Sequence, residues 1–360
     1  MAHRKLSTWL AAGSIVCIAA GCVPDVEEAD TLVVAPRVLA IRSEPAQIEP
    51  RDEGTFLALF VSPDGTHEEA PLNWAFCNAR KPLAELGPVN PLCLLENAHE
   101  IEQPVPAADD EEAEEPEPIL EEIGDGIEAA GDVPPDACRL FGPERPPPKD
   151  GEPAGRPVDA DATGGYYQPL RVFNPDDDSV ALYQARLVCG LPGAGQAITR
   201  AFNRRFAANA NPAIAELVVT SDDDRALTVA GEGEVTRARP GDSLELELRW
   251  NECEPLPSCD EDDDECETPE VCTGAESYIY YDPLSRVLSE RREGMRVSWF
   301  ATGGAFRNAR TGRTEQEADT TNSPNAWTAP DEEGDVTLWT VLRDDRGGVA
   351  WQTYPLRIER

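Results

Sequence analysis

The sequence predicts an all-β protein built from two antiparallel β-sandwiches. Its apolar runs are short and lie between clusters of Gly, Pro, Asn and Asp, as in strands joined by turns. Gly and Pro make up 60 of the 360 residues, about 17% against a usual ~12%, which disfavours long helices. Once an N-terminal signal of residues 1–21 is removed, the remaining chain is too long for one ordinary domain and suits two.

The N-terminus predicts export and lipid attachment. Arg4 and Lys5 precede an apolar stretch over residues 6–20, which is too short to span a membrane comfortably. Small residues then lead to Cys22 in the run Ile-Ala-Ala-Gly-Cys. This arrangement resembles a bacterial lipoprotein signal, which implies cleavage before Cys22 and acylation of its thiol. An ordinary secretory signal with an incidental cysteine is the alternative.

Residues 22–31 are acidic and form the expected tether, and residues 32–192 form the expected N-terminal domain. Turn clusters at 62–65 and 174–178 separate its predicted strands. Alternating side chains from Phe56 to Phe60 indicate a strand whose two faces differ in burial. The predicted strands cover residues 38–42, 54–61, 72–77, 166–173 and 181–189.

Residues 97–165 predict a disordered insertion in this domain. An acidic run covers residues 109–115, and three consecutive prolines stand at 146–148. Such a composition buries too little apolar surface to offset the entropy lost on ordering. Residues 119–127 are interpreted as part of the same solvated segment.

Residues 193–212 predict a helical connector. Ile198, Phe202 and Phe206 are spaced four apart, which indicates a helix over residues 194–208. Pro212 and the asparagines before it end the pattern. The C-terminal domain then covers residues 213–360, with a Cys-rich acidic insertion over 251–276. Its predicted strands cover 215–219, 226–230, 243–250, 277–281, 296–301, 335–342 and 349–358.

The last third of the chain resembles bacterial Ig-like domains of the PKD and cadherin kind. The matching features are Trp327 with Pro330, the turn at Gly334, a strand ending at Asp344, and a Gly-Gly hairpin at 347–348. This resemblance implies Ig-like sandwiches and transfers no catalytic residue. With Cys22, the whole chain resembles the Pro-rich, acidic surface lipoproteins of myxobacteria.

Eight cysteines besides Cys22 follow the signal, and an even number in an oxidising compartment predicts four disulfides. They divide into an early and a late set of four, which suggests two bridges in each domain. For the early set we favour Cys77–Cys189 and Cys93–Cys138, although each set allows three connectivities. The candidates are Cys77, Cys93, Cys138, Cys189, Cys253, Cys259, Cys266 and Cys272.

The acidic loop between Cys253 and Cys272 is a candidate Ca²⁺ site. Carboxylates suit this ion, and a disulfide across the base would hold them together. The spacing differs from the EF-hand pattern, and a solvated, disulfide-stapled hairpin is the alternative reading. The ligand candidates are Asp260, Asp262, Asp263 and Asp264. No other cofactor is expected.

Charge and composition narrow the function. The formal net charge of −38 disfavours nucleic acid as a partner. Only His67 and His99 follow the signal, which leaves little material for a nucleophile–histidine relay, and no catalytic residue is assigned.

We therefore expect a non-enzymatic lipoprotein of the outer membrane, where Val23 after the lipid cysteine fits onward transport. Its partners would be the membrane, through the lipid, and a surface protein or polysaccharide. The alternatives are a carbohydrate-active enzyme or carbohydrate-binding accessory module, and a Ca²⁺-dependent adhesin.

Overall fold

The computed structural model describes nine segments of the chain. The predicted signal and all of the tether before Asp30, including Cys22, lie outside them. The described residues are 30–79, 89–103, 117–138, 165–191, 194–221, 226–229, 235–256, 271–282 and 285–360.

The N-terminal half forms a sandwich of two sheets. Its N-outer sheet has the strand order β2-β11-β10-β5-β8, and its N-inner sheet has the order β1-β3-β4 with β9 also paired to β3. A small β6–β7 pair and two 3₁₀ turns, η1 (Pro91–Leu94) and η2 (Ala98–Glu100), accompany them. The strands are β1 (Arg37–Glu44), β2 (Gln47–Ile48), β3 (Glu53–Ser62), β4 (Gly65–Thr66), β5 (Asn73–Cys77), β6 (Glu102–Gln103), β7 (Glu117–Pro118), β8 (Leu120–Asp125), β9 (Glu128–Asp132), β10 (Gly165–Asn174) and β11 (Ser179–Val188).

The C-terminal half forms a second sandwich. Its C-inner sheet has the order β14-β23-β22-β18-β20, and its C-outer sheet has the order β13-β12-β15-β21-β19. A separate β16–β17 ribbon and the 3₁₀ turn η3 (Glu315–Glu317) complete it. The strands are β12 (Ile214–Ser221), β13 (Ala226–Val229), β14 (Thr236–Ala238), β15 (Ser243–Trp250), β16 (Ser277–Asp282), β17 (Val287–Arg292), β18 (Met295–Ala301), β19 (Ala305–Phe306), β20 (Arg310–Arg313), β21 (Asn322–Thr328), β22 (Gly334–Arg343) and β23 (Val349–Ile358).

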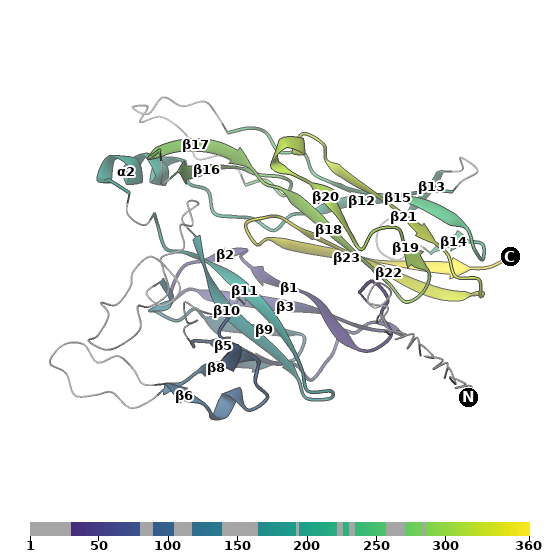
Figure 1. Cartoon of the computed structure of the whole chain (residues 1–360), viewed down its shortest axis with the longest axis horizontal. Coiled ribbons are helices and arrows are strands. Elements are labelled where there is room, and N and C mark those ends of the chain that lie inside the picture. The colour runs from purple at the N-terminus through teal and green to yellow at the C-terminus, as the bar shows by residue number, and fades with distance from the viewer. Residues whose placement is uncertain are drawn as a thin grey trace, which may run out of the picture.

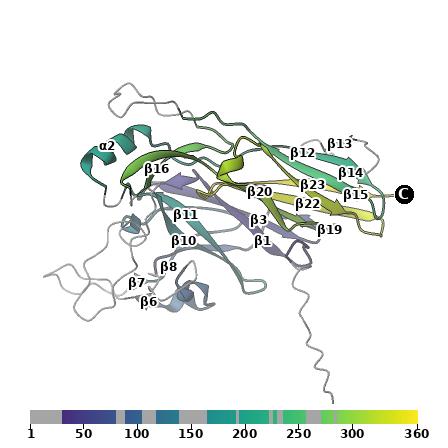
Figure 2. The same cartoon turned by 45° about the horizontal axis from the view of Figure 1, so that its top comes forward.

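The two sandwiches stack face to face, so that four sheets lie in layers (Figures 1 and 2). Apart from two short parallel pairs, β2–β11 and β14–β23, the described ladders between strands are antiparallel. Each sandwich has its own core, with Phe56 and Trp74 in the first and Trp299 and Trp327 in the second. The predicted all-β, two-sandwich fold class is confirmed.

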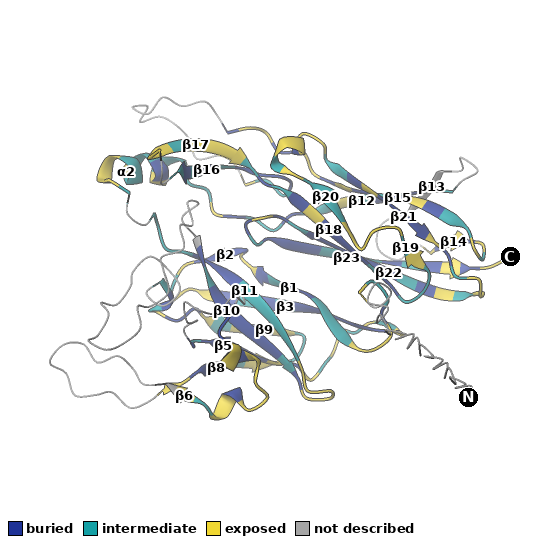
Figure 3. Ribbon diagram, viewed as in Figure 1, coloured by how far each residue is buried: buried dark blue, intermediate teal, exposed yellow. Residues whose placement is uncertain are grey.

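A third apolar layer joins the two inner sheets. Leu59 and Val61 from β3 pack in one cluster with Trp339 and Val341 from β22. The inner sheets are therefore covered on both faces. For this reason the sequences of β3 and β22 are nearly continuous apolar runs and do not alternate between apolar and polar residues. Figure 3 shows the resulting band of buried strands through the middle of the molecule. The expectation that the faces of β3 differ in burial holds only for its first residues.

The predicted connector helix is present as α2 (Gln196–Arg205). Phe202 is buried, and it packs with Phe206 against Ile279 of the β16–β17 ribbon. The residues after the helix reach the N-terminal sandwich, because the Asn209 N–H donates to Gln47 Oε1 at 2.9 Å and Asn211 Nδ2 donates to the Ser43 carbonyl at 2.8 Å.

The prediction of disorder across residues 97–165 is wrong for residues 97–103, which hold η2 and β6, and for residues 117–132. Residues 117–132 form β7, β8 and β9, of which β8 joins the N-outer sheet through β5 and β9 joins the N-inner sheet through β3. Their glutamates and aspartates stand on exposed edge-strand positions, while Ile119 and Ala129 are buried. The hairpin between them holds Gly126 at φ 99°, and its carbonyl accepts from Trp74 Nε1 at 2.7 Å. Residues 104–116 and 139–164 lie outside the described residues.

The favoured early disulfides, Cys77–Cys189 and Cys93–Cys138, are also wrong. The structure pairs Cys77 with Cys93 and Cys138 with Cys189, at Cα–Cα distances of 5.9 Å and 5.6 Å. Cys77 ends β5 and Cys189 follows β11, and these strands lie on opposite sides of β10. Two strand spacings, about 9–10 Å, exceed the ~7 Å that a disulfide can bridge. In the late set Cys253 pairs with Cys272, and Cys259 and Cys266 lie outside the described residues.

Replacing both Cys138 and Cys189 by serine should destabilise the protein more than replacing both Cys77 and Cys93. Loop-closure entropy predicts losses of about 4 and about 3 kcal/mol, because the first bridge closes the longer loop. Urea unfolding of the two double variants measures the difference. Peptide mapping without reduction should recover the Cys77–Cys93 and Cys138–Cys189 peptides, and a Cys77–Cys189 peptide would contradict the assigned pairing.

The apolar layer between the inner sheets predicts energetic coupling between the sandwiches. Leu59→Ala should cost about 2–4 kcal/mol of unfolding free energy. Combined with Val341→Ala, its effect should be non-additive by ~0.5 kcal/mol or more, because both side chains fill the same layer. The matched control combines Leu59→Ala with Leu246→Ala, which lies in the C-terminal core. Additive losses in both double variants, measured by urea unfolding, would rule out a shared layer.

Candidate functional site

A half-open groove of about 990 Å³ lies between the two sandwiches. One wall comes from β1 and β11 of the N-terminal sandwich. The other wall comes from β18, β20 and the turn between β22 and β23. Both β1 and β20 are edge strands of their sheets. Because the apolar layer fixes the distance between the inner sheets, the groove is part of the rigid body rather than a gap between independent domains.

Three arginines line one end of this groove. Arg296 on β18 stands directly opposite Arg343 on β22. Arg310 on β20 stands opposite Ser298, two residues along β18 from Arg296. Since side chains alternate across a strand, the three arginines share one face of the C-inner sheet, the face toward the N-terminal sandwich. Within the described segments, no carboxylate lies within 4.0 Å of any of the three guanidinium groups.

Arg343 is the most enclosed of the three. Its Nη2 donates across the groove to the Leu39 carbonyl at 3.2 Å, and its Nη1 lies 3.5 Å from the Ser298 hydroxyl. Burial lowers the pKa of Arg343 to about 10, and the nearby charges of Arg310 and Arg296 act in the same direction. The guanidinium remains charged at neutral pH, so this end of the groove is positive.

Tyr183 from β11 closes the groove on its N-terminal side. Its hydroxyl lies 3.0 Å from the Ser43 hydroxyl and donates to the Gly347 carbonyl at 3.3 Å. Burial raises the pKa of Tyr183 to about 12. The phenol is therefore neutral, and it ties β11 to the β22–β23 turn.

A buried charged cluster lies next to the groove, behind the β22–β23 turn. Arg346 donates from Nε to Glu293 at 2.6 Å and from Nη2 to Glu276 at 2.7 Å. Asp344 Oδ1 accepts the backbone N–H groups of Arg346 and Gly348 at 2.9 Å and 2.8 Å. Glu293 and Arg346 are almost fully buried. Because the cluster joins the turn, the connector and the β16–β17 ribbon, it sets the shape of this end of the groove.

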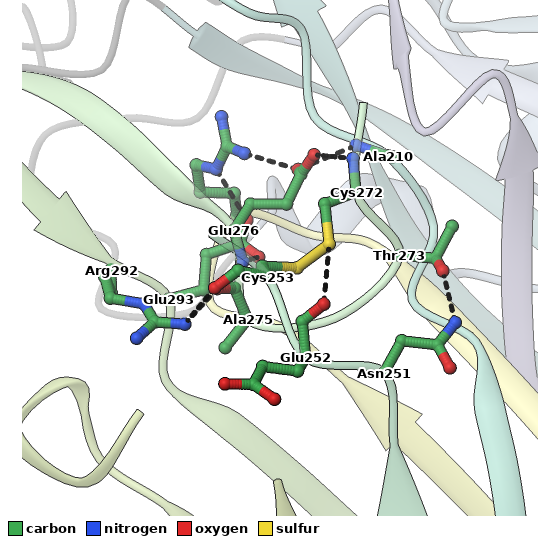
Figure 4. The surroundings of a disulfide bond; sticks show 11 residues. Ala210, Asn251, Glu252, Cys253, Cys272, Thr273, Ala275, Glu276, Arg292 and Glu293 are labelled. Carbon is green, nitrogen blue, oxygen red and sulfur yellow. Dashed lines mark hydrogen bonds and ion pairs between the residues drawn. A yellow bond between two sulfur atoms is a disulfide. The ribbon is translucent and has the colours of Figure 1, made fainter. Parts of the chain in front are cut away.

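The Cys253–Cys272 disulfide supports this cluster (Figure 4). The Cys272 N–H donates to one oxygen of Glu276 at 3.2 Å, and the Ala210 N–H donates to the other at 3.2 Å. Arg292 Nη2 donates to the Cys253 carbonyl at 2.9 Å. The base of the Cys-rich insertion is thus a structural support, and it holds Glu276 toward the connector.

The cluster holds three carboxylates around one guanidinium. Burial raises the pKa of Glu293 well above its usual value, and Asp344 adds to the shift while Arg346 opposes it. Burial likewise raises the pKa values of Asp344 and Glu276. For Arg346, burial acts to lower the pKa, but Glu293 and Glu276 outweigh it and raise the pKa. The guanidinium is therefore charged, and the carboxylates retain protons more readily than free ones.

The groove contains none of the residues predicted for lipid attachment, disulfides or Ca²⁺ binding, although Asp344 and the predicted hairpin glycines Gly347 and Gly348 line it. Cys22, Asp260, Asp262, Asp263 and Asp264 lie outside the described residues. Among the residues that the structure describes, no group of three or more His, Cys, Asp or Glu could hold a metal ion.

Exposed tyrosine rings can stack on sugars, and the structure covers four tyrosine rings that could otherwise serve in this way. Tyr166 and Tyr281 are buried. Guanidinium groups lie over the rings of Tyr278 and Tyr280, at 4.8 Å from Arg346 and 3.8 Å from Arg291.

Sequence reasoning missed the three groove arginines. They lie 14 to 47 residues apart along the chain, and only the ladder β20-β18-β22 brings them together. The sequence does place Arg296 and Arg343 within predicted or adjoining strands, beside apolar residues. The sequence does not give the register between strands, which is needed to see that these arginines lie together.

No protein-family model and no curated protein sequence matches this chain. Among solved structures, the chain is similar to the D00-D0 domain of intimin, with 7% identity, a TM-score of 0.20, and coverage of 91% of this chain and 100% of the other. It is also similar to BspA_C_WT, with 9% identity, a TM-score of 0.21, and coverage of 90% and 99%. A third is dimeric latent PorU from Porphyromonas gingivalis, with 11% identity, a TM-score of 0.20, and coverage of 90% of this chain and 24% of PorU. The fold assignment rests on the strand order itself and not on these likenesses.

Asp344→Asn should stabilise the protein at pH 8 by about 1 kcal/mol, because it removes a buried charge that has too few counter-charges. The new amide keeps the oxygen that accepts from Arg346 and Gly348. Asn209 Nδ2 donates to the Asp344 carboxylate at 3.3 Å, and once the Asn209 amide turns over, its Oδ1, which has no partner among the described residues, can accept from the new N–H₂ group.

The expected pH dependence follows from the raised carboxylate pKa values. The folded protein binds protons more tightly than the unfolded chain, so this stabilisation is full below pH ~4 and is lost as the pH rises through the folded-state values. The gain from Asp344→Asn should therefore shrink between pH 8 and pH 5 in thermal unfolding. Asp335→Asn, at an exposed site, is the control. A variant that is less stable than the wild type at pH 8 would contradict the charge imbalance.

Proposed function

We propose that this protein is a non-enzymatic binding module, exported and anchored through a lipid on Cys22, and that the groove between its sandwiches is the binding site. The observation that carries this proposal is a cavity of ligand size, walled by both sandwiches and fixed by a buried apolar layer. Such a groove presents side chains in fixed positions, which favours binding without a large ordering cost.

Oxidised cysteines support export. Each of the three described disulfides joins buried or partly buried positions within one sandwich or its loops. Disulfides of this kind persist in oxidising compartments and are rare in the cytosol. The lipoprotein-like signal and the disulfides thus both favour export, and Val23 after the lipid cysteine favours onward transport to the outer membrane.

The start of the described chain supports a tethered arrangement. The Val33 N–H donates to the Ala301 carbonyl at 2.8 Å, and the Ala301 N–H donates to the Thr31 carbonyl at 2.9 Å. Val33 is buried in the layer between the sandwiches. No described helix is long and apolar enough to cross a membrane. In this proposal the anchor is the lipid, and the tether enters the body at the junction of the two sandwiches.

Labelling with palmitate in a bacterial host tests the anchor. The wild-type protein should incorporate label and fractionate with membranes, whereas Cys22→Ala should do neither. Cys17→Ala is the matched control, because Cys17 lies within the predicted signal and should leave labelling unchanged. Equal labelling of Cys22→Ala and the wild type would remove the anchor from the proposal.

A further inference from the structure

The arginine end of the groove carries three positive charges, and of the three side chains only Arg343 makes a hydrogen bond within the described part of the chain. Residues directly opposite each other on neighbouring strands have Cβ atoms ~5 Å apart, and like charges at such positions destabilise a sheet. Arg296 and Arg343 are opposite each other in this way. Arg310 adds a third positive charge on the same face. The chain has 69 Asp and Glu against 31 Lys and Arg. Three arginines on one face of a sheet therefore contrast with the acidic composition of the chain.

Other arginines near the same interface have structural partners. Arg37 lies over the ring of Phe300 at 5.6 Å, and Arg42 lies over that of Trp351 at 5.0 Å. Arg296 and Arg310, by contrast, are exposed and make no side-chain hydrogen bond or ion pair within the described part of the chain. Their donors are available to a ligand.

We propose that this end of the groove binds the phosphate or sulfate group of a small ligand. Guanidinium groups present planar forks of N–H donors that match the oxygens of such oxyanions. Three of them on one face can each take an oxygen of a tetrahedral group, and a single carboxylate offers only two oxygens. The inference rests on the proposed binding function, since it names the ligand class of the same groove.

The groove also limits the rest of the ligand. Its volume of about 990 Å³ leaves room for an organic group of moderate size beside the oxyanion. Its lining includes Leu39, Tyr167 and Tyr183, which suits a sugar or another uncharged ring. Glu315 and Asp345 also line the groove and would repel a second anionic group. The net charge of −38 disfavours long polyanions such as nucleic acids, so a small monoester fits best.

Calorimetric titration of the full-length protein in detergent, at low ionic strength, tests the proposal. The probes are glucose 6-phosphate, glucose 6-sulfate, inorganic phosphate, glucose, citrate and an acidic peptide copying residues 109–115. We expect the two esters to bind, inorganic phosphate to bind more weakly, and glucose not to bind. Stronger binding by the phosphate or the sulfate ester distinguishes the two oxyanions.

Arg296→Gln and Arg310→Gln should each weaken ester binding about tenfold or more, as expected for the loss of one charge-assisted contact. Neither should lower the melting temperature, because each substitution relieves like-charge repulsion. Arg307→Gln is the matched control: Arg307 is exposed and pairs with Glu245 at 3.1 Å, and it does not line the groove.

Unchanged ester affinity in both groove variants, or no ester binding by the folded wild type, would overturn the oxyanion assignment. Preferential binding of citrate or the acidic peptide would also overturn it, in favour of carboxylate recognition. Binding of glucose alone, unaffected by the two variants, would overturn the inference while leaving the groove as a binding site.

Discussion

The apolar layer between the two inner sheets determines the rest of this structure. Each sandwich already has a complete core, so the layer formed by Leu59, Val61, Trp339 and Val341 is additional burial that makes two domains one body. Because the layer sets the distance and angle between the sheets, it also creates the groove. The arginine-bearing face of β18 and β22 would otherwise be an open sheet surface, and the N-terminal sandwich turns it into a wall.

The charged cluster around Arg346 complements this layer at one end of the interface. An apolar layer gives affinity with little preference for one orientation, whereas buried hydrogen bonds with fixed partners favour a single arrangement. Asn209 and Asn211, just after α2, bond to Gln47 and Ser43 of the N-terminal sandwich. The connector is therefore part of the interface, and the Cys253–Cys272 bridge stabilises it through Glu276.

Sequence reasoning located most long strands and the helix, because alternation and turn residues are local signals. It did not find β8 and β9, since their acidic side chains are exposed on edge strands and few of their residues, such as Leu120 and Ala129, enter the core. Disulfide pairing failed because it depends on which strands flank β10. The arginine site failed for the same reason, as register across β20, β18 and β22 is a property of the sheet. The continuous apolar runs of β3 and β22 did carry a readable sign of two-sided burial.

The pairing of Thr31 and Val33 with Ala301 has a mechanical meaning if Cys22 carries the anchor. The nine peptide steps from Cys22 to Thr31 extend no further than about 30 Å, so the body would stand close to the bilayer surface. A force on the body would be transmitted to the lipid through the hydrogen bonds that join Thr31 and Val33 to Ala301 at the end of β18. It would not pass through one terminal domain alone. The load would enter where both sandwiches meet, and neither could be drawn away from the membrane without the other.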